Sequence, residues 1–190
     1  MPQSFETDQL IAECRAALRE ASPHVAIKEI VERAVSQPGD VERALGTPRR
    51  AEMATLYRSP ELTILNLVWG PCMSLYPHDH RMWAVIGLYG GREDNTFYRR
   101  TAQGLVEAGG RTLERSDAII LGETVIHAVE NPLEKLTGAI HVYGGDFFGV
   151  PRSEWDPATL RERPYDVENV KRVFEESNQR LRFERGDPPA

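Results

Sequence analysis

The sequence has little cysteine, no long apolar run and no cluster of positive charge. Two cysteines are too few for a disulfide framework or for a metal knuckle built from cysteine pairs. No run of about eighteen apolar residues occurs, and the stretch MPQSFETDQL lacks the basic and apolar regions of a secretory signal. The 23 Lys and Arg and the 29 Asp and Glu residues are mixed along the chain, so no basic stripe is available to bind nucleic acid. We therefore expect a soluble, cytoplasmic protein without a nucleic-acid or membrane partner.

The two cysteines differ in their surroundings. Cys14 lies on the apolar side of a helical pattern, where we expect a buried thiol that serves packing. Cys72 lies close in sequence to a pair of histidines. Packing is the preferred interpretation for Cys72 as well, and a redox or steric role stays open.

The sequence pattern changes twice along the 190 residues, from helical to β and back to helical. Its 41% hydrophobic and 27% charged residues are typical of one ordinary globular domain. Residues 1–50 carry helical patterns, and the pair Ser22-Pro23 marks the start of the second helix, because a proline in the first turn gives up no hydrogen bond. Residues 57–150 form the expected β core. Residues 151–190 supply a closing helix, over about residues 167–183, and a tail.

The β core is indicated by short runs rich in β-branched and aromatic residues. Breaks that contain glycine or proline separate these runs, and no helical pattern intervenes. The runs are ELTILNLVW, RMWAVIGLY, NTFYRR, DAIILG, IHAVEN and TGAIHVYGG. Many short strands without connecting helices predict a mainly β protein, either an antiparallel sandwich or a small barrel. The acidic pair Glu93-Asp94, between two of the runs, is interpreted as a solvated turn.

Four of the five histidines fall in this β core. His78 and His80 alternate along an expected strand, so their side chains project from one face and Asp79 from the other. That placement suits two imidazoles on one metal ion. It argues against Asp79 as the carboxylate of a two-histidine, one-carboxylate iron site.

Later runs supply the remaining histidines. His127 heads a short run and is the candidate third ligand, because neighbouring strands of a barrel can bring it close to the first two histidines. His141 and Tyr143 are two residues apart on an expected strand and should share a face. The sequence therefore predicts a metal site of three histidines, with a histidine–tyrosine pair on another strand.

With these residues assembled, the chain resembles the cupins, and among them the thiol dioxygenases typified by cysteine dioxygenase. The segments PHDH, HAVEN and IHVYGGDFF resemble that family's in order and spacing, and LNLVWGP resembles the strand before them. The similarity covers about residues 57–148. It implies a double-stranded β-helix, a jelly-roll barrel, with helices before and after it and a metal inside.

The resemblance also implies residue roles. The implied ligands of a non-haem iron(II) are His78, His80 and His127. The implied catalytic pair, which shapes the pocket for oxygen and substrate, is His141 and Tyr143. Arg58, with Tyr57 beside it, resembles the arginine that holds the substrate carboxylate.

The chain departs from the family at three positions. Ala84 stands where the common cupin pattern has a glutamate, which implies a three-ligand site. Val85 stands where mammalian-type cysteine dioxygenases carry the cysteine that crosslinks to the tyrosine, so no thioether is expected. Ala139 stands where the family has a serine that hydrogen-bonds to the histidine of the catalytic pair.

The implied function is the oxidation of a small, carboxylate-bearing thiol to a sulfinate by dioxygen. Three neutral imidazoles leave the full charge on a divalent ion, which favours an anionic thiolate. Other chemistry stays open, because the same site with zinc, nickel or manganese suits an isomerase, a lyase or a hydrolase. With iron it also suits a dioxygenase that cleaves carbon–carbon bonds. A non-enzymatic, metal-binding sensor is a further alternative. Pairing into homodimers through sheet edges or N-terminal segments also stays open.

Overall fold

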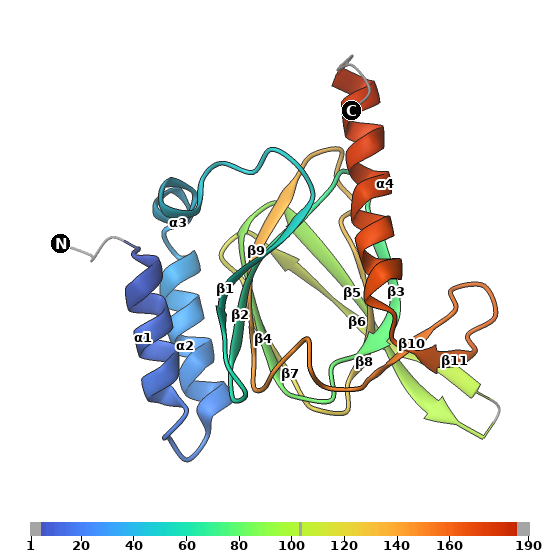
Figure 1. The fold of residues 1–190 in the computed structure, drawn as a ribbon, viewed down its shortest axis with the longest axis horizontal. Coiled ribbons are helices and arrows are strands. Elements are labelled where there is room, and N and C mark those ends of the chain that lie inside the picture. The colour runs from blue at the N-terminus through green and yellow to red at the C-terminus, as the bar shows by residue number, and fades with distance from the viewer. Residues whose placement is uncertain (1–4, 103, 186–190) are drawn as a thin grey trace.

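The computed structural model describes residues 5–102 and 104–185, and its centre is a pair of antiparallel β-sheets (Figure 1). One sheet has five strands in the order β1-β2-β9-β4-β7. In that order the strands span Glu52–Arg58, Thr63–Trp69, Thr137–Tyr143, Ala84–Gly90 and Ala118–Leu121. The second sheet has six strands in the order β11-β10-β3-β8-β5-β6. In that order they span Glu162–Pro164, Ser153–Trp155, Ser74–Asp79, Ile126–Glu130, Arg92–Thr101 and Gly104–Glu114.

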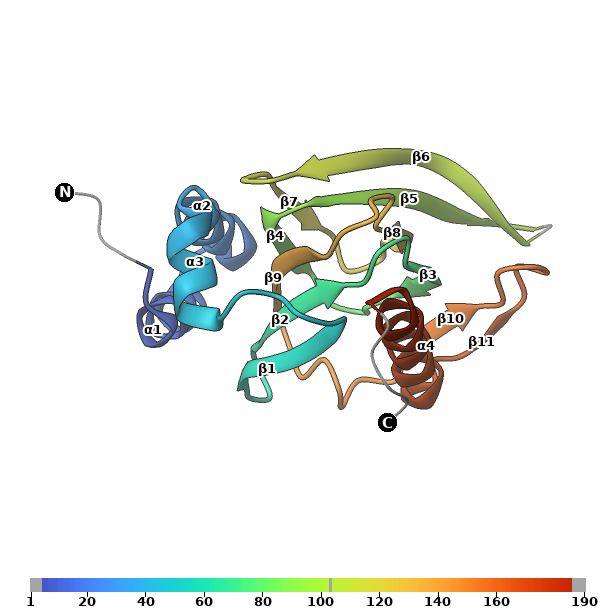
Figure 2. The ribbon, with the colours of Figure 1, turned by 90° about the horizontal axis from the view of Figure 1, so that it is seen from above.

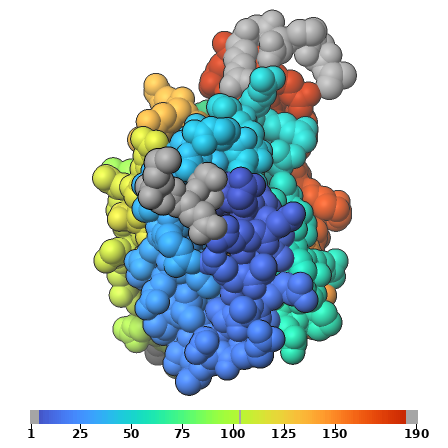
Figure 3. All heavy atoms as spheres, turned by 90° about the vertical axis from the view of Figure 1, so that its left-hand side faces the viewer, coloured from blue at the N-terminus to red at the C-terminus, as the bar shows by residue number. Residues whose placement is uncertain are grey.

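Helices lie on two opposite sides of the sheets (Figures 1 and 2). The outer face of the five-stranded sheet is covered by the N-terminal helices, which fill the face seen in Figure 3. They are α1 (Thr7–Ala17), α2 (Pro23–Val35) and α3 (Pro38–Leu45). On the other side lies α4 (Val167–Arg185), whose Asn178 bonds to both backbone polar groups of Ala51. In the described ranges, no helix combines the length and the apolar character needed to span a membrane.

Three central strands, β2, β9 and β4, are buried on both faces, because alternate side chains serve two different hydrophobic clusters. On β9, Ala139 and Tyr143 join the cluster between the two sheets. Ile140 and Val142 join the cluster beneath the N-terminal helices. His141 lies two residues from both Ala139 and Tyr143 on the same strand, so it shares their face and points into the space between the sheets.

The approach of α2 to the sheet depends on a glycine in β4. A Cβ at Gly87 would lie 2.3 Å from Cγ1 of Val31 and 3.1 Å from Cγ1 of Val35. Both valines are fully buried. The absence of a side chain at position 87 therefore sets the distance between helix and sheet.

The predicted fold class is confirmed: the protein is mainly β, a cupin-like jelly roll with helices before it and one after it. The second helix begins at Pro23 with Ser22 in the cap position, as predicted, although the Ser22 side chain makes no cap hydrogen bond. The interpretation of Glu93-Asp94 as a solvated turn is wrong. Both residues lie in β5, and Glu93 is fully buried because it points between the sheets.

Candidate metal centre

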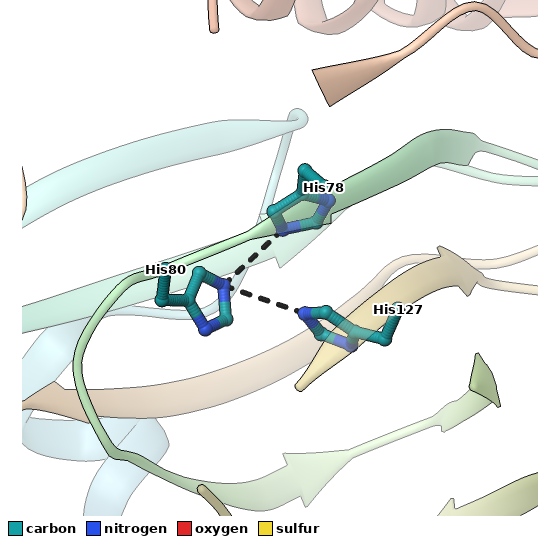
Figure 4. A group of neighbouring side chains, drawn as sticks. All are labelled: His78, His80 and His127. Atoms are coloured by element: carbon teal, nitrogen blue, oxygen red, sulfur yellow. Dashed lines mark hydrogen bonds between the residues drawn. The ribbon is translucent and has the colours of Figure 1, made fainter. Parts of the chain in front are cut away.

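Strands β3 and β8 bring the three predicted ligands together. His78 on β3 and His127 on β8 are directly opposite each other in the antiparallel register, which places their side chains on one face of the pair. His80 follows the last residue of β3, and the next residue, Arg81, turns the chain with a φ of 56°. The three imidazoles point toward one another (Figure 4).

The spacing of the three rings fits one metal ion. Nε2 of His80 lies 3.2 Å from Nε2 of His78 and 3.4 Å from Nε2 of His127, and all three ligand atoms lie within 4.8 Å of one another. Two nitrogens that each lie about 2.1 Å from the same ion are about 3.0 Å apart when the nitrogen–metal–nitrogen angle is a right angle. They are about 3.4 Å apart when that angle is tetrahedral. Within residues 5–102 and 104–185, the metal-binding group consists of these histidines and contains no carboxylate.

The other ring nitrogens indicate which atoms carry protons. Nδ1 of His78 lies 3.0 Å from the carbonyl oxygen of Tyr76, and Nδ1 of His127 lies 2.7 Å from Oδ1 of Asn95. Both partners accept hydrogen bonds, so each Nδ1 carries the hydrogen and donates it. The Nε2 lone pairs of these rings are thus free for a metal, as in most protein sites where a histidine binds a metal.

The three rings are neutral at physiological pH. Each is buried, and burial disfavours the charged form. Burial lowers the pKa of His78 to about 4. It also lowers the pKa values of His80 and His127 well below the ordinary value of 6.5, and the neighbouring histidines lower them further. Neutral imidazole is the form that binds a metal ion.

The predicted histidine–tyrosine pair borders the same site. Nδ1 of His141 lies 3.0 Å from the Tyr143 hydroxyl, and the centre of the Tyr143 ring lies 5.0 Å from that of His80. Burial raises the pKa of Tyr143 above its ordinary value, so the phenol keeps its proton. Nε2 of His141 is buried without a hydrogen-bond partner and faces the Glu93 carboxylate at 3.8 Å.

The site lies in a small chamber next to a larger groove. The chamber has a volume of about 20 Å³ and is lined by the three metal-site histidines, His141 and Tyr143, among others. The groove has a volume of about 320 Å³ and runs between β1 and α4. Met53, Phe147 and Tyr165 line both spaces, so these three side chains form the wall between them.

Arg152 lies in the groove at this wall. Its guanidinium carbon is 3.9 Å from the ring centres of both Phe147 and Tyr165, and the side chain is 7% exposed. It donates to the Phe147 carbonyl, whereas its Nε is buried without a hydrogen-bond partner. A buried cation with a free donor is suited to bind an anionic group of a ligand.

The structure does not bring Arg58 to this site. Its side chain is half exposed, and Nε and Nη2 donate to the two carboxylate oxygens of Asp146 at 2.8 and 2.9 Å. It lines neither the chamber nor the groove. The structure therefore places Arg58 away from the three histidines, with Nε and Nη2 paired to Asp146.

The cysteines lie outside the chamber. Cys14 is buried as predicted, and burial raises its pKa to about 12, so the thiol stays protonated. Cys72 is exposed, which contradicts the preferred interpretation that it packs in the core.

Comparison with known proteins concerns the fold. No protein-family model matches the chain. An RmlC-like cupin family protein from Methanocaldococcus jannaschii, with a double-stranded β-helix fold, is 9% identical, with 54% of this chain and 87% of that chain covered and a TM-score of 0.46. A cupin superfamily protein from Desulfitobacterium hafniense is 14% identical, with coverage of 54% and 85% and a TM-score of 0.43. The oxalate decarboxylase of Bacillus subtilis, which has Mn(II) centres, is 14% identical, with coverage of 46% and 22% and a TM-score of 0.39.

Proposed function

We propose that this protein is an iron-dependent thiol dioxygenase that converts a small, acid-bearing thiol and dioxygen into a sulfinate. The observation that carries the proposal is the convergence of three neutral imidazole Nε2 atoms, without a carboxylate in the group, in a buried chamber bordered by Tyr143. The similarity of the sequence to the thiol dioxygenases supports the same conclusion. Bound iron(II) would lower the pKa of the substrate thiol and supply the oxygen chemistry.

The three imidazoles favour an anionic sulfur ligand. Because none of them carries a charge, the ion's two positive charges are not cancelled by the protein ligands. A site with two histidines and a carboxylate would be less positive by one charge. The donor set thus supports a thiolate substrate over a neutral one.

Arg152 would bind the acid group of the substrate. Its guanidinium carbon lies 3.9 Å from the ring centres of Phe147 and Tyr165, and these contacts hold the donors in place before a ligand arrives. Its free Nε is one end of the guanidinium fork that pairs with carboxylates. Arg152 lies in the groove and the three histidines line the chamber. A short molecule with sulfur at one end and a carboxylate at the other would place its sulfur at the histidines and its carboxylate at Arg152.

His141 and Tyr143 would orient the substrate and exclude water. Nδ1 of His141 lies within hydrogen-bond distance of the phenol oxygen, and the phenol remains protonated beside His80. When Nδ1 donates to that oxygen, the single O–H of Tyr143 is left to donate to oxygen atoms of the substrate or product. The aromatic walls keep bulk water away from the reacting sulfur.

The test is oxygen uptake by protein loaded anaerobically with iron(II). Cysteine and 3-mercaptopropionate should drive uptake with stoichiometric sulfinate, and propanethiol, which lacks the acid group, should be a much poorer substrate. Arg152→Gln should raise KM for the acid thiols by roughly 10- to 100-fold, because a charge-assisted hydrogen bond is lost. The matched control Arg58→Gln should leave KM unchanged. An iron-replete protein that shows no thiol-dependent uptake would refute the proposal.

A further inference from the structure

Glu93 is a buried carboxylate that lies next to the candidate metal centre. It is fully buried on β5. Its Oε2 accepts a hydrogen bond from Nε1 of Trp69 at 2.8 Å, and its Oε1 accepts one from Nδ2 of Asn95 at 3.0 Å. Its Oε2 also faces Nε2 of His141 at 3.8 Å. Burial of a carboxylate is costly unless its oxygens are satisfied, so a specific role needs to account for it.

The geometry points to Glu93 as a positioning residue that acts through Asn95 to hold the ring proton of the metal-site histidine His127 on Nδ1. This inference rests on the metal-binding part of the proposed function. Glu93 and Asn95 alternate along β5 and face the same way. A carboxylate only accepts hydrogen bonds, so the Asn95 amide must turn its NH₂ group toward Glu93. Its Oδ1 then faces Nδ1 of His127 at 2.7 Å and accepts the hydrogen there. The His127 proton is thereby held on Nδ1, and Nε2 is left as the ligand atom.

The same carboxylate connects the two halves of the site. On the metal side it acts through Asn95 on His127, and on the substrate side it faces His141, which holds the Tyr143 hydroxyl. Position 139, where the resembled family has a serine two residues before its histidine, is Ala139 here. Glu93 faces His141 from a different strand and a different sheet, at 3.8 Å and without a hydrogen bond.

An isosteric change at position 93 should break this arrangement. Glu93→Gln replaces one acceptor oxygen with a donor NH₂ group. Since Trp69 still needs an acceptor, the new NH₂ group faces Asn95 and forces that amide to flip. The Asn95 NH₂ group then points at Nδ1 of His127, which moves the ring proton to Nε2 and occupies the ligand atom. Loss of such an outer partner typically weakens metal binding by about 10- to 100-fold.

A second change should restore the pattern. In Glu93→Gln/Asn95→Asp, the glutamine NH₂ group donates to the new carboxylate, and that carboxylate accepts the hydrogen from Nδ1 of His127. The net charge equals that of the wild type. The matched control is Asp94→Asn, because Asp94 lies on the same strand but bonds to Arg92 and Thr112 on the outer side.

The experiment measures iron(II) and zinc affinity by chelator competition under anaerobic conditions in these variants. We expect about 10- to 100-fold weaker binding in Glu93→Gln, recovery to near the wild-type value in the double variant, and no change in Asp94→Asn. Equal affinity of wild type and Glu93→Gln, or a double variant no better than Glu93→Gln, overturns the role of Glu93. A wild type that binds neither metal overturns the proposed function.

A spectroscopic measurement tests the inference without metal, first in the wild type and then in Glu93→Gln. Nitrogen-15 NMR of the metal-free wild type should show the His127 ring protonated on Nδ1. Protonation on Nε2 overturns the inference whether or not the protein is a dioxygenase. A purely structural role for Glu93 would lower the unfolding temperature of Glu93→Gln but would not change the proton position in His127.

Discussion

Acid should destabilise the metal-free protein through its buried histidines. The pKa of His78 is about 4 in the folded protein, against 6.5 for an ordinary histidine such as that of the unfolded chain. Between these two values the unfolded chain binds a proton that the folded protein does not. The free energy of unfolding is therefore fully retained above about pH 6.5 and falls as the pH is lowered toward 4.

The size of this effect follows from the pKa difference. Each pH unit between the two values lowers the free energy of unfolding by about 1.4 kcal/mol per histidine. Lowering the pH from 7 to 4.5 should thus remove about 2 to 3 kcal/mol through His78 alone. His80 and His127 act in the same direction, because their pKa values are lowered too.

The assay is urea unfolding of protein treated with a chelator, at pH 7 and at pH 4.5, for the wild type and for His78→Gln. Carboxylates also titrate over this range, but they do so in both proteins, so the difference between the proteins isolates the histidine. We expect the wild type to lose about 2 to 3 kcal/mol more than the variant. Equal losses in the two proteins would show that His78 is not held neutral by burial.

Three further changes test the site and its support. His127→Ala should abolish retention of metal, measured by elemental analysis, while far-ultraviolet circular dichroism shows the barrel intact; metal content equal to that of the wild type would contradict the assignment. Tyr143→Phe should lower the turnover number with metal content unchanged, and unchanged turnover would remove Tyr143 from the mechanism. Gly87→Ala should lower the free energy of unfolding by about 1–3 kcal/mol, because its Cβ would overlap Val31. Gly39→Ala in α3, which has nothing within 4 Å, is the control and should stabilise the helix by roughly 0.5–1 kcal/mol.

The metal-site histidines could be predicted from the sequence because short-range periodicity determines the direction of a side chain. The sequence predicted that His78 and His80, two residues apart, face the same way; the structure ends the strand at Asp79 and still brings their Nε2 atoms to 3.2 Å. His141 and Tyr143 follow the same rule on β9. His127 was a candidate because neighbouring strands of a barrel can bring it close to the first two histidines, and the resemblance implied the same ligand; that β3 pairs with β8 to do so is a finding of the structure.

Glu93 and Arg152 could not be predicted, because their roles depend on residues distant in the chain. Glu93 accepts a hydrogen bond from Trp69 of the other sheet, whereas its neighbour Asp94 faces outward. The sequence alone does not distinguish these two adjacent acidic residues. Arg152 sits in a polar stretch that resembles a surface loop, and one of the two rings that bury it, Tyr165, comes from a segment 13 residues further along.

The strand β6 was not predicted for a different reason. It contains two adjacent glycines, Gly109 and Gly110, and mostly exposed polar side chains, so it lacks the alternation that marks a half-buried strand. It pairs only with β5 at the rim of the six-stranded sheet. Its formation depends on that neighbour, which supplies its hydrogen bonds.

The narrow wall between groove and chamber has a kinetic consequence. A space of about 20 Å³ holds little more than one water molecule, so a multi-carbon molecule does not fit beside the histidines with Met53, Phe147 and Tyr165 in their observed positions. Arrival and departure must therefore wait for these side chains to move aside. Of the three, the methionine has the most rotatable bonds and adapts most readily. The rate of exchange, and the size of the molecule that is admitted, therefore depend on how far these three side chains move, Met53 most readily.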